Sequence, residues 1–393
     1  MQALLFCCCG VDVHRDILEV CILKGLSDEP EPIRARFKTT QADLIKFVNW
    51  LKEHQCLHVA MESTGVYWRP VYEAIEKYYD SYKSLLVVNA HHMRNLPGRK
   101  TDTQDAEWIA TLLRHGLLEA SFVPDRIIRT LREYSRTYKT EIQEKTRLLN
   151  RLEKFLQNHG FKLSSVLSDI TGASGRKILN LLADKGHITV TEIKSSVSKR
   201  VKCSIEEIDA AVCGELELFE RRLLKHFLEK LDLLEKSIAN LLEDMKELAA
   251  PYRSALEKMD SVPGIDLTAS LLILAEIGAS PMNNFKSPEH LCSWAGLSPR
   301  NDESAGKIKS KKILHGNPYI KSILCQVSWA AVKCRNSCFA NWFWSHQGKL
   351  GKKKAIIAVS RKILYIIYLL IQRGVMFDPA ISLMSSKRQP ALN

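Results

Sequence analysis

The 393-residue sequence lacks the patterns that mark a zinc protein, a secreted protein or a membrane protein. Its 11 cysteines include no CxxC pair and no cysteine–histidine series at zinc-ligand spacing. The three consecutive cysteines at 7–9 lie in an apolar run, which is typical of small buried strand residues in a reducing compartment. The first ten residues, MQALLFCCCG, have neither the charged region nor the cleavage site of a secretory signal. We therefore expect a cytoplasmic protein.

Long hydrophobic runs without charge are also missing. The most apolar stretch, AIIAVSRKILYIIYLLI, contains Arg361 and Lys362 and is shorter than a membrane span, so we expect a buried helix and no membrane partner. The sequence has an excess of basic charge instead, with 57 lysines and arginines against 44 acids and a formal charge of +13. Such a balance favours a polyanionic partner, either nucleic acid or an anionic membrane, and does not choose between them.

Apolar runs and helical patterns alternate through the first third of the chain. Strands are predicted at residues 4–13, 17–23, 35–40, 57–62 and 84–90. Helices are predicted near 41–54, after the turn that follows residue 62, and in the segment KTDTQDAEWIATLLRHG at 100–116. This order of strands and helices predicts an α/β sheet with crossover helices.

The pattern becomes helical from about residue 126. Apolar positions spaced by three and four run from Ile128 to Leu156, with two polar interruptions, and again from Leu224 to Leu248. They predict two long helices on either side of a connecting region at about 160–215. The two helices either form a coiled coil between subunits or pack within one subunit. Near residue 251 a third region begins, and its Pro-Gly turn between two helices is typical of a helix-hairpin-helix element that presents amides to a phosphate.

Four carboxylates stand at the ends of predicted elements. Asp12 closes the first strand, Glu62 closes the strand at 57–62, and Asp102 and Asp105 lie three residues apart in the first turn of a helix. Taken singly, strand-end acids are usually solvated, and acids at a helix start usually cap it or offset its macrodipole. In a ribonuclease H-like fold the two strands are parallel neighbours and the helix lays its acids against their ends. Converging carboxylates repel one another unless cations neutralise them, so the set predicts a Mg²⁺ or Mn²⁺ site for phosphodiester chemistry.

Segments at both ends of the chain carry a family resemblance. GVDVHRDILEV, VAMESTGVYWRPV, VVNAHHMRN and KTDTQDAEWIATLLRHGLL resemble the N-terminal domain of DEDD transposases from bacterial insertion sequences, the recombinases guided by a bridge RNA. VPGIDLTASLLILAEIG and FKSPEHLCSWAGLSPRNDESAGKIKSKKILHGNPYIKSIL are similar to the C-terminal transposase domain of that family. The resemblance implies a RuvC-like (RNase H-like) α/β catalytic domain at 1–125, a coiled-coil helical oligomerisation region at 126–250, and a mainly α C-terminal transposase domain with a serine nucleophile at 251–393.

The resemblance also implies which residues act. The catalytic and metal-binding tetrad of the family falls on Asp12, Glu62, Asp102 and Asp105. The serine nucleophile, which follows a Gly-Leu-x-Pro stretch at 296–299, falls on Ser304 in a small-residue segment predicted to be a loop. Ala305 follows it where many relatives have glycine, so Ser298 and Ser310 stay as alternatives.

Two sets of residues are predicted to bind nucleic acid. Basic side chains near Ser304 would hold a phosphate electrostatically; these are Arg300, Lys307, Lys309, Lys311 and Lys312. Tyr67, Trp68 and Arg69, just after the Glu62 strand, would stack on bases or clasp RNA, with core packing as the alternative for the two aromatics.

The resemblance implies a Mg²⁺-dependent recombinase that cuts and rejoins donor and target DNA under the guidance of a noncoding bridge RNA. Ser304 would attack the scissile phosphate, form a covalent phosphoserine–DNA intermediate and release a 3′-hydroxyl. The implied assembly is a tetramer of two dimers in the bacterial cytoplasm, associated with the nucleoid. Two other functions stay open: a hydrolytic RuvC-like nuclease or Holliday-junction resolvase in which water replaces the serine, and a non-catalytic nucleic-acid-binding protein.

Overall fold

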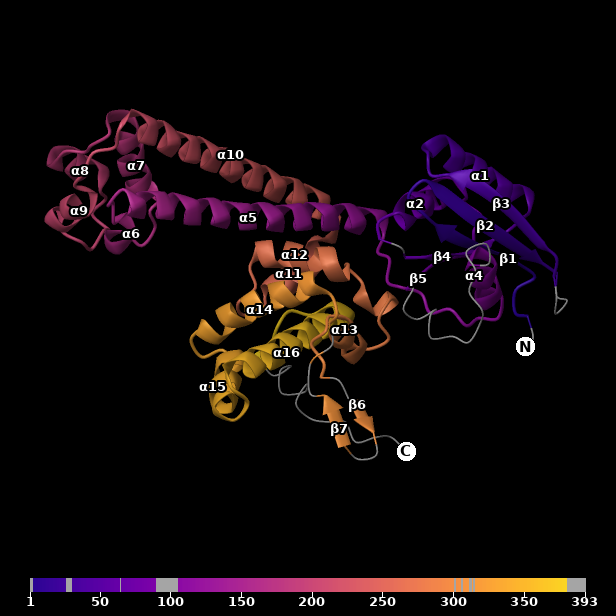
Figure 1. Ribbon diagram of the computed structural model, residues 1–393. Coiled ribbons are helices and arrows are strands. Elements are labelled where there is room, and N and C mark those ends of the chain that lie inside the picture. The colour runs from indigo at the N-terminus through magenta and orange to yellow at the C-terminus, as the bar shows by residue number, and fades with distance from the viewer. Residues whose placement is uncertain are drawn as a thin grey trace. The chain divides into compact units, whose positions relative to one another are not determined.

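The computed structural model describes residues 3–25, 30–63, 65–89, 105–299, 302–304, 307–310, 313 and 315–379 (Figure 1). The chain divides into two compact units, which we call the N-terminal unit, Met1–Val123, and the C-terminal unit, Pro124–Asn393. A further division of the C-terminal unit near residue 250 stays a prediction.

A five-stranded mixed sheet forms the centre of the N-terminal unit (Figure 1). Its strands are β1 (Cys7–Val13), β2 (Ile17–Lys24), β3 (Pro32–Lys38), β4 (His58–Glu62) and β5 (Ser84–Val88). They are ordered β3-β2-β1-β4-β5, with β1 antiparallel to β2 and parallel to β4, and with β4 parallel to β5. The helices are α1 (Gln41–Glu53), α2 (Trp68–Tyr78) and α4 (Asp105–Arg114). This arrangement is consistent with the predicted RNase H-like α/β fold.

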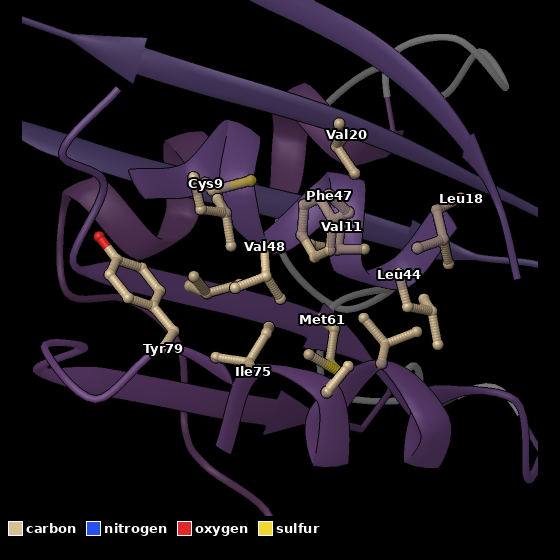
Figure 2. Close-up of a cluster of buried hydrophobic side chains, with 14 of the residues drawn as sticks. Cys9, Val11, Leu18, Val20, Leu44, Phe47, Val48, Met61, Ile75 and Tyr79 are labelled. Carbon is tan, nitrogen blue, oxygen red and sulfur yellow. The ribbon is translucent and has the colours of Figure 1, made fainter. Parts of the chain in front are cut away.

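The two faces of β1 pack against different helices because successive strand residues point to opposite sides. Cys9 and Val11 lie in a core with Phe47 and Val48 of α1 and with Met61 of β4 (Figure 2). The alternate residues of β1 face α4. Burial on both sides explains why β1 has a continuous apolar sequence rather than an alternating one.

Helix α4 lies directly on β1 at Gly10. A Cβ atom added to Gly10 would stand 2.0 Å from the carbonyl oxygen of Ala106 and 2.4 Å from the amide nitrogen of Ala110, both in the backbone of α4. Only glycine permits so close an approach of strand and helix. The contact therefore fixes the first turn of α4 over the carboxyl end of β1.

We expect Gly10→Ala to destabilise the N-terminal unit by about 3 kcal/mol, because backbone atoms on both sides of the new methyl group must move. Thermal unfolding followed by circular dichroism measures the effect. Gly348→Ala is the matched control, since no atom lies within 4 Å of a Cβ placed there. An unchanged unfolding midpoint for Gly10→Ala would contradict the packing of α4 on β1.

Two long helices extend through the C-terminal unit (Figure 1). Residues predicted for the two long helices lie in α5 (Arg126–Asn158) and α10 (Leu218–Leu248), which contact each other along their length. Leu148 of α5 packs with Leu231 and Leu234 of α10. Four helices between them share a core with the adjoining ends of α5 and α10; they are α6 (Leu163–Val166), α7 (Ala173–Lys185), α8 (Val190–Ser196) and α9 (Ile205–Val212).

The rest of the C-terminal unit is mainly helical, with one β-hairpin. Its elements are η2 (Ala250–Tyr252), α11 (Arg253–Asp260), α12 (Leu267–Ile277), η3 (Pro281–Asn283), α13 (Pro288–Trp294), β6 (Asp302–Ser304), β7 (Lys307–Ser310), α14 (Pro318–Lys333), α15 (Cys338–Leu350) and α16 (Lys352–Arg373). The predicted Pro-Gly turn lies between α11 and α12. Its Gly264 packs against α14, where an added Cβ would stand 2.4 Å from the amide nitrogen of Ala331.

A buried carboxylate ties three helices of this unit together. Glu276 of α12 is 1% exposed, and its oxygens accept hydrogen bonds from the Arg136 guanidinium of α5 at 3.1 Å and the Asn317 amide at 2.7 Å. Asn317 also caps α14 by accepting hydrogen bonds from the amides of Tyr319 and Ile320. A buried charge is tolerated only when it is paired in this way, so the network fixes the start of α14 against α5 and α12.

Within the part of the chain that the structure describes, α16 is long and apolar enough to cross a membrane by length and composition. Of its most apolar window, 56% is buried inside the protein. The buried hydroxyl of Ser360 in α16 lies 2.8 Å from that of Ser328 in α14, and both residues are 0% exposed. This packing agrees with the predicted buried helix.

Candidate functional site

Asp12 and Glu62 end neighbouring parallel strands and point to the same side of the sheet. The register pairs Gly10 with Ala60 and Val11 with Met61, so Asp12 and Glu62 follow one step further along β1 and β4. Ala60 packs in the core under α4, and Asp12 and Glu62 lie two residues beyond Gly10 and Ala60. Because strand residues alternate, both carboxylates face the α4 side.

Asp105 is the first residue of α4, directly before the Ala106 that covers Gly10. The contact between strand and helix thus brings a third carboxylate to the same end of the sheet. Burial raises the pKa of Asp12, and the negative charges of Asp105 and Glu62 raise the same pKa further. Asp12 therefore interacts electrostatically with both Asp105 and Glu62.

A histidine that the sequence analysis missed accompanies Asp12. The imidazole Nε2 of His14 lies 3.0 Å from Asp12 Oδ2, and its charge opposes the rise in the pKa of Asp12. His14 is largely exposed while Asp12 is 7% exposed, so the imidazole sits on the open side of the carboxylate. The sequence carries little signal for this pair, because His14 lies just past the end of β1, where the alternation of strand residues no longer fixes a face.

The fourth predicted ligand, Asp102, lies outside the described residues. Among the residues the structure describes, no group of three histidines, cysteines or acids stands close enough to hold a metal ion. The chemistry of the donors nevertheless suits Mg²⁺, which prefers carboxylate oxygens. Asp12 is a nearly buried carboxylate beside two like charges, an arrangement that a divalent cation would relieve. Glu107, also on α4, pairs instead with Arg34 at 2.6 Å.

The three residues predicted to clasp nucleic acid have different surroundings. Trp68, the first residue of α2, packs against the N-terminal core and meets the ring of Tyr72 edge-on at 5.8 Å. Core packing, the alternative, therefore describes Trp68. Tyr67 is 38% exposed, and Arg69 pairs with Glu73 at 2.8 Å.

Ser304 lies in a β-hairpin, so the loop predicted around Ser304 is wrong for residues 302–304, which form β6. Ser304 ends β6 and pairs with Lys307 at the start of β7, while Ser310 pairs with Asp302 at the other end. The alternating sequence of β7 is typical of a strand. Lys307 and Lys309 belong to β7; Arg300, Ala305, Lys311 and Lys312 lie outside the described residues.

The N-terminal unit is an α/β unit with carboxylates at the ends of adjoining strands, and it is joined to a helical unit. Comparison with known proteins places a chain of this kind in the class of DNA transposases and recombinases. Residues 9–161 match a transposase family of the IS110 type with the DEDD motif, and residues 256–342 match the transposase family IS116/IS110/IS902. The chain belongs to this transposase family.

Two curated relatives extend the similarity over nearly the whole chain. They are the pilin gene-inverting proteins of Moraxella lacunata and Moraxella bovis. Each is 22% identical over 382 residues, which cover 95% of this chain and 98% of the relative. The two matched regions of the chain are therefore joined in the same way in these relatives.

Asp12 is buried beside the negative charges of Asp105 and Glu62, so we expect its carboxylate to destabilise the folded protein when no metal is present. A carboxyl group whose pKa is raised on folding contributes stability that is lost as the pH rises through that pKa. In EDTA at neutral pH, Asp12→Asn should therefore raise the thermal midpoint by a few degrees. Mg²⁺ should raise the midpoint of the wild type and leave that of Asp12→Asn unchanged.

Asp16→Asn is the matched control, because the Asp16 side chain is 69% exposed and pairs with the exposed Arg15. Asp16→Asn should have the thermal midpoint of the wild type both in EDTA and in Mg²⁺. A lower midpoint for Asp12→Asn in EDTA, or an equal response of both proteins to Mg²⁺, would contradict a metal-relieved carboxylate cluster.

Proposed function

We propose that the chain cuts and rejoins donor and target DNA with Ser304 as the nucleophile and with Asp12, Glu62, Asp102 and Asp105 as the ligands of Mg²⁺ or Mn²⁺. The observation that carries the proposal is the shared position of Asp12, Glu62 and Asp105 on the α4 side of the sheet, where the two neighbouring charges raise the pKa of Asp12. Nothing about DNA binding alone requires converging acids, and their mutual repulsion has a cost.

In this reaction the Ser304 Oγ forms a bond to phosphorus and the bond from phosphorus to the 3′-oxygen breaks. The hydroxyl proton of Ser304 passes to a base, for which a carboxylate of the acidic set is available, and the leaving oxygen gains a proton to become a 3′-hydroxyl. When bound, a divalent ion neutralises the carboxylates and stabilises charge on the phosphate. The phosphoserine bond conserves the energy of the phosphodiester, so the released strand can be rejoined to a new partner.

Guidance by a noncoding bridge RNA and assembly as a tetramer of two dimers are further parts of the proposal. A basic chain without a recognisable motif for reading bases suits a protein that leaves sequence choice to base pairing. The long α5 and α10 helices offer extended surface for a second subunit. The name of the curated relatives, pilin gene-inverting protein, describes a rearrangement of DNA that requires both cutting and rejoining.

The alternative is a hydrolytic nuclease or Holliday-junction resolvase that uses the same acids and a water molecule. A denaturing gel separates the two, using full-length protein, labelled donor DNA, Mg²⁺ and RNA transcribed from the flanks of the element. A labelled adduct that disappears on protease treatment supports the proposal. Cleavage without any adduct would assign the protein to the hydrolytic class.

A further inference from the structure

The basic charge of the chain is concentrated in one region. Residues 304–377 contain 14 lysines and arginines and no aspartate or glutamate, which gives this region alone a charge of +14 against +13 for the whole chain. In a region with positive charge and no acids, no aspartate or glutamate of that region competes with a polyanion for the lysines and arginines. Its described helices, α14, α15 and α16, are mutually packed in the C-terminal unit.

Two exposed tryptophans lie among these charges. Trp344 of α15 is 62% exposed and Trp329 of α14 is 42% exposed. Both indoles contact the buried ring of Phe343, with centroid distances of 5.3 Å for Trp344 and 5.8 Å for Trp329. They are therefore held on a rigid base while they face solvent, which is the condition for stacking on a ligand. By contrast, Trp342 already stacks on His346 at 4.2 Å.

Exposed lysines lie on the same helices as the tryptophans and at the start of α16. Lys333 follows Trp329 by one helical turn, Lys349 lies near the end of α15, and residues 352–354 form the first turn of α16. Figure 1 shows α15 placed where the end of α14 and the start of α16 meet. We call Trp329, Lys333, Trp344, Lys349 and residues 352–354 the Trp–Lys surface.

We propose that the Trp–Lys surface binds an unpaired strand of the DNA substrate. Lysines neutralise the phosphates, and the indoles stack on base faces, which a duplex keeps hidden and an unpaired strand exposes. Cutting and rejoining DNA passes through such strands. The inference rests on the proposed function only in choosing DNA as the polynucleotide.

Fluorescence anisotropy with the full-length protein in EDTA tests the surface without metal or cleavage, so its result is independent of Ser304. The probes are a labelled single-stranded DNA oligonucleotide, the same sequence as duplex DNA, the same sequence as RNA, and vesicles with anionic lipid. We expect the single-stranded DNA to be the probe whose binding depends most on Trp344, because RNA and duplex DNA also bind where the proposed function requires them. Trp344→Ala should weaken binding of the single-stranded DNA about tenfold, and Trp344→Phe should restore most of it.

Replacement of residues 352–354 by glutamine should weaken binding and reduce the slope of log affinity against log salt by about 2. The matched control replaces Lys194, Lys199 and Lys225, three exposed lysines outside the surface, and should leave binding nearly unchanged. Unchanged affinity in Trp344→Ala with native circular dichroism would overturn the proposal. An equal loss of duplex DNA binding in Trp344→Ala, or a larger loss of RNA or vesicle binding than of single-stranded DNA binding, would overturn it as well.

Discussion

Ser304→Ala should abolish the covalent protein–DNA adduct and slow strand cleavage by about 10³-fold or more, since no other group at that position can form the bond to phosphorus. The measurement is the denaturing gel with donor DNA, RNA and Mg²⁺, quantified with and without protease. Thermal unfolding of the variant should match the wild type, because one hydroxyl at the end of a short hairpin contributes little to folding. The loss of cleavage would then reflect a slower chemical step and not an unfolded protein.

The alternative serines provide matched controls for Ser304→Ala. Ser310 lies at the other end of the same hairpin, and Ser298 precedes it in the chain. Ser298→Ala and Ser310→Ala should both retain the adduct. If the adduct persists in Ser304→Ala and disappears in one of these two, the nucleophile moves to that residue. If cleavage persists in Ser304→Ala without any adduct, water is the nucleophile.

The N-terminal sheet could be predicted from the sequence because local patterns determine most of it. Two short apolar runs, one through β1 and one ending at Glu62, have the length of strands and clear boundaries. Each could therefore be interpreted only as a strand. The close contact of α4 with Gly10 could not be predicted, since a glycine in a strand is equally typical of a bulge. That contact decides which end of the sheet receives Asp105, so the proximity of Asp105 to Asp12 follows from the packing of α4 and not from sequence spacing.

In the C-terminal unit the sequence indicated the helices, but it did not indicate the hairpin or which helical side chains are exposed. The hairpin that carries Ser304 was predicted as a loop, because three-residue strands fall below the length at which alternation is detectable. Trp344 and Trp329 were not singled out, since an aromatic residue on a helix usually packs in a core. Their exposure and their shared contact with the buried ring of Phe343 depend on how α14 and α15 pack, which local sequence patterns do not show.

Asp105→Asn should reduce cleavage by roughly 10³-fold, which corresponds to the loss of about 4 kcal/mol of transition-state stabilisation. The amide has the shape of the carboxylate but lacks its charge, so the helix should keep its place over Gly10. A titration of the cleavage rate with Mn²⁺ should show a higher half-saturating concentration and partial recovery at saturation, because a site with one fewer anionic ligand binds the ion more weakly.

Glu107→Gln provides the control on the same helix, two residues further along. Its carboxylate pairs with Arg34 at 2.6 Å in an exposed position, and an exposed ion pair contributes at most about 1 kcal/mol. Its cleavage rate and Mn²⁺ dependence should therefore equal those of the wild type. Asp102→Asn should behave like Asp105→Asn if both acids bind the ion. Wild-type Mn²⁺ dependence in Asp105→Asn would remove α4 from the metal site, whereas equal losses in the two aspartate variants would assign the ion to the start of this helix.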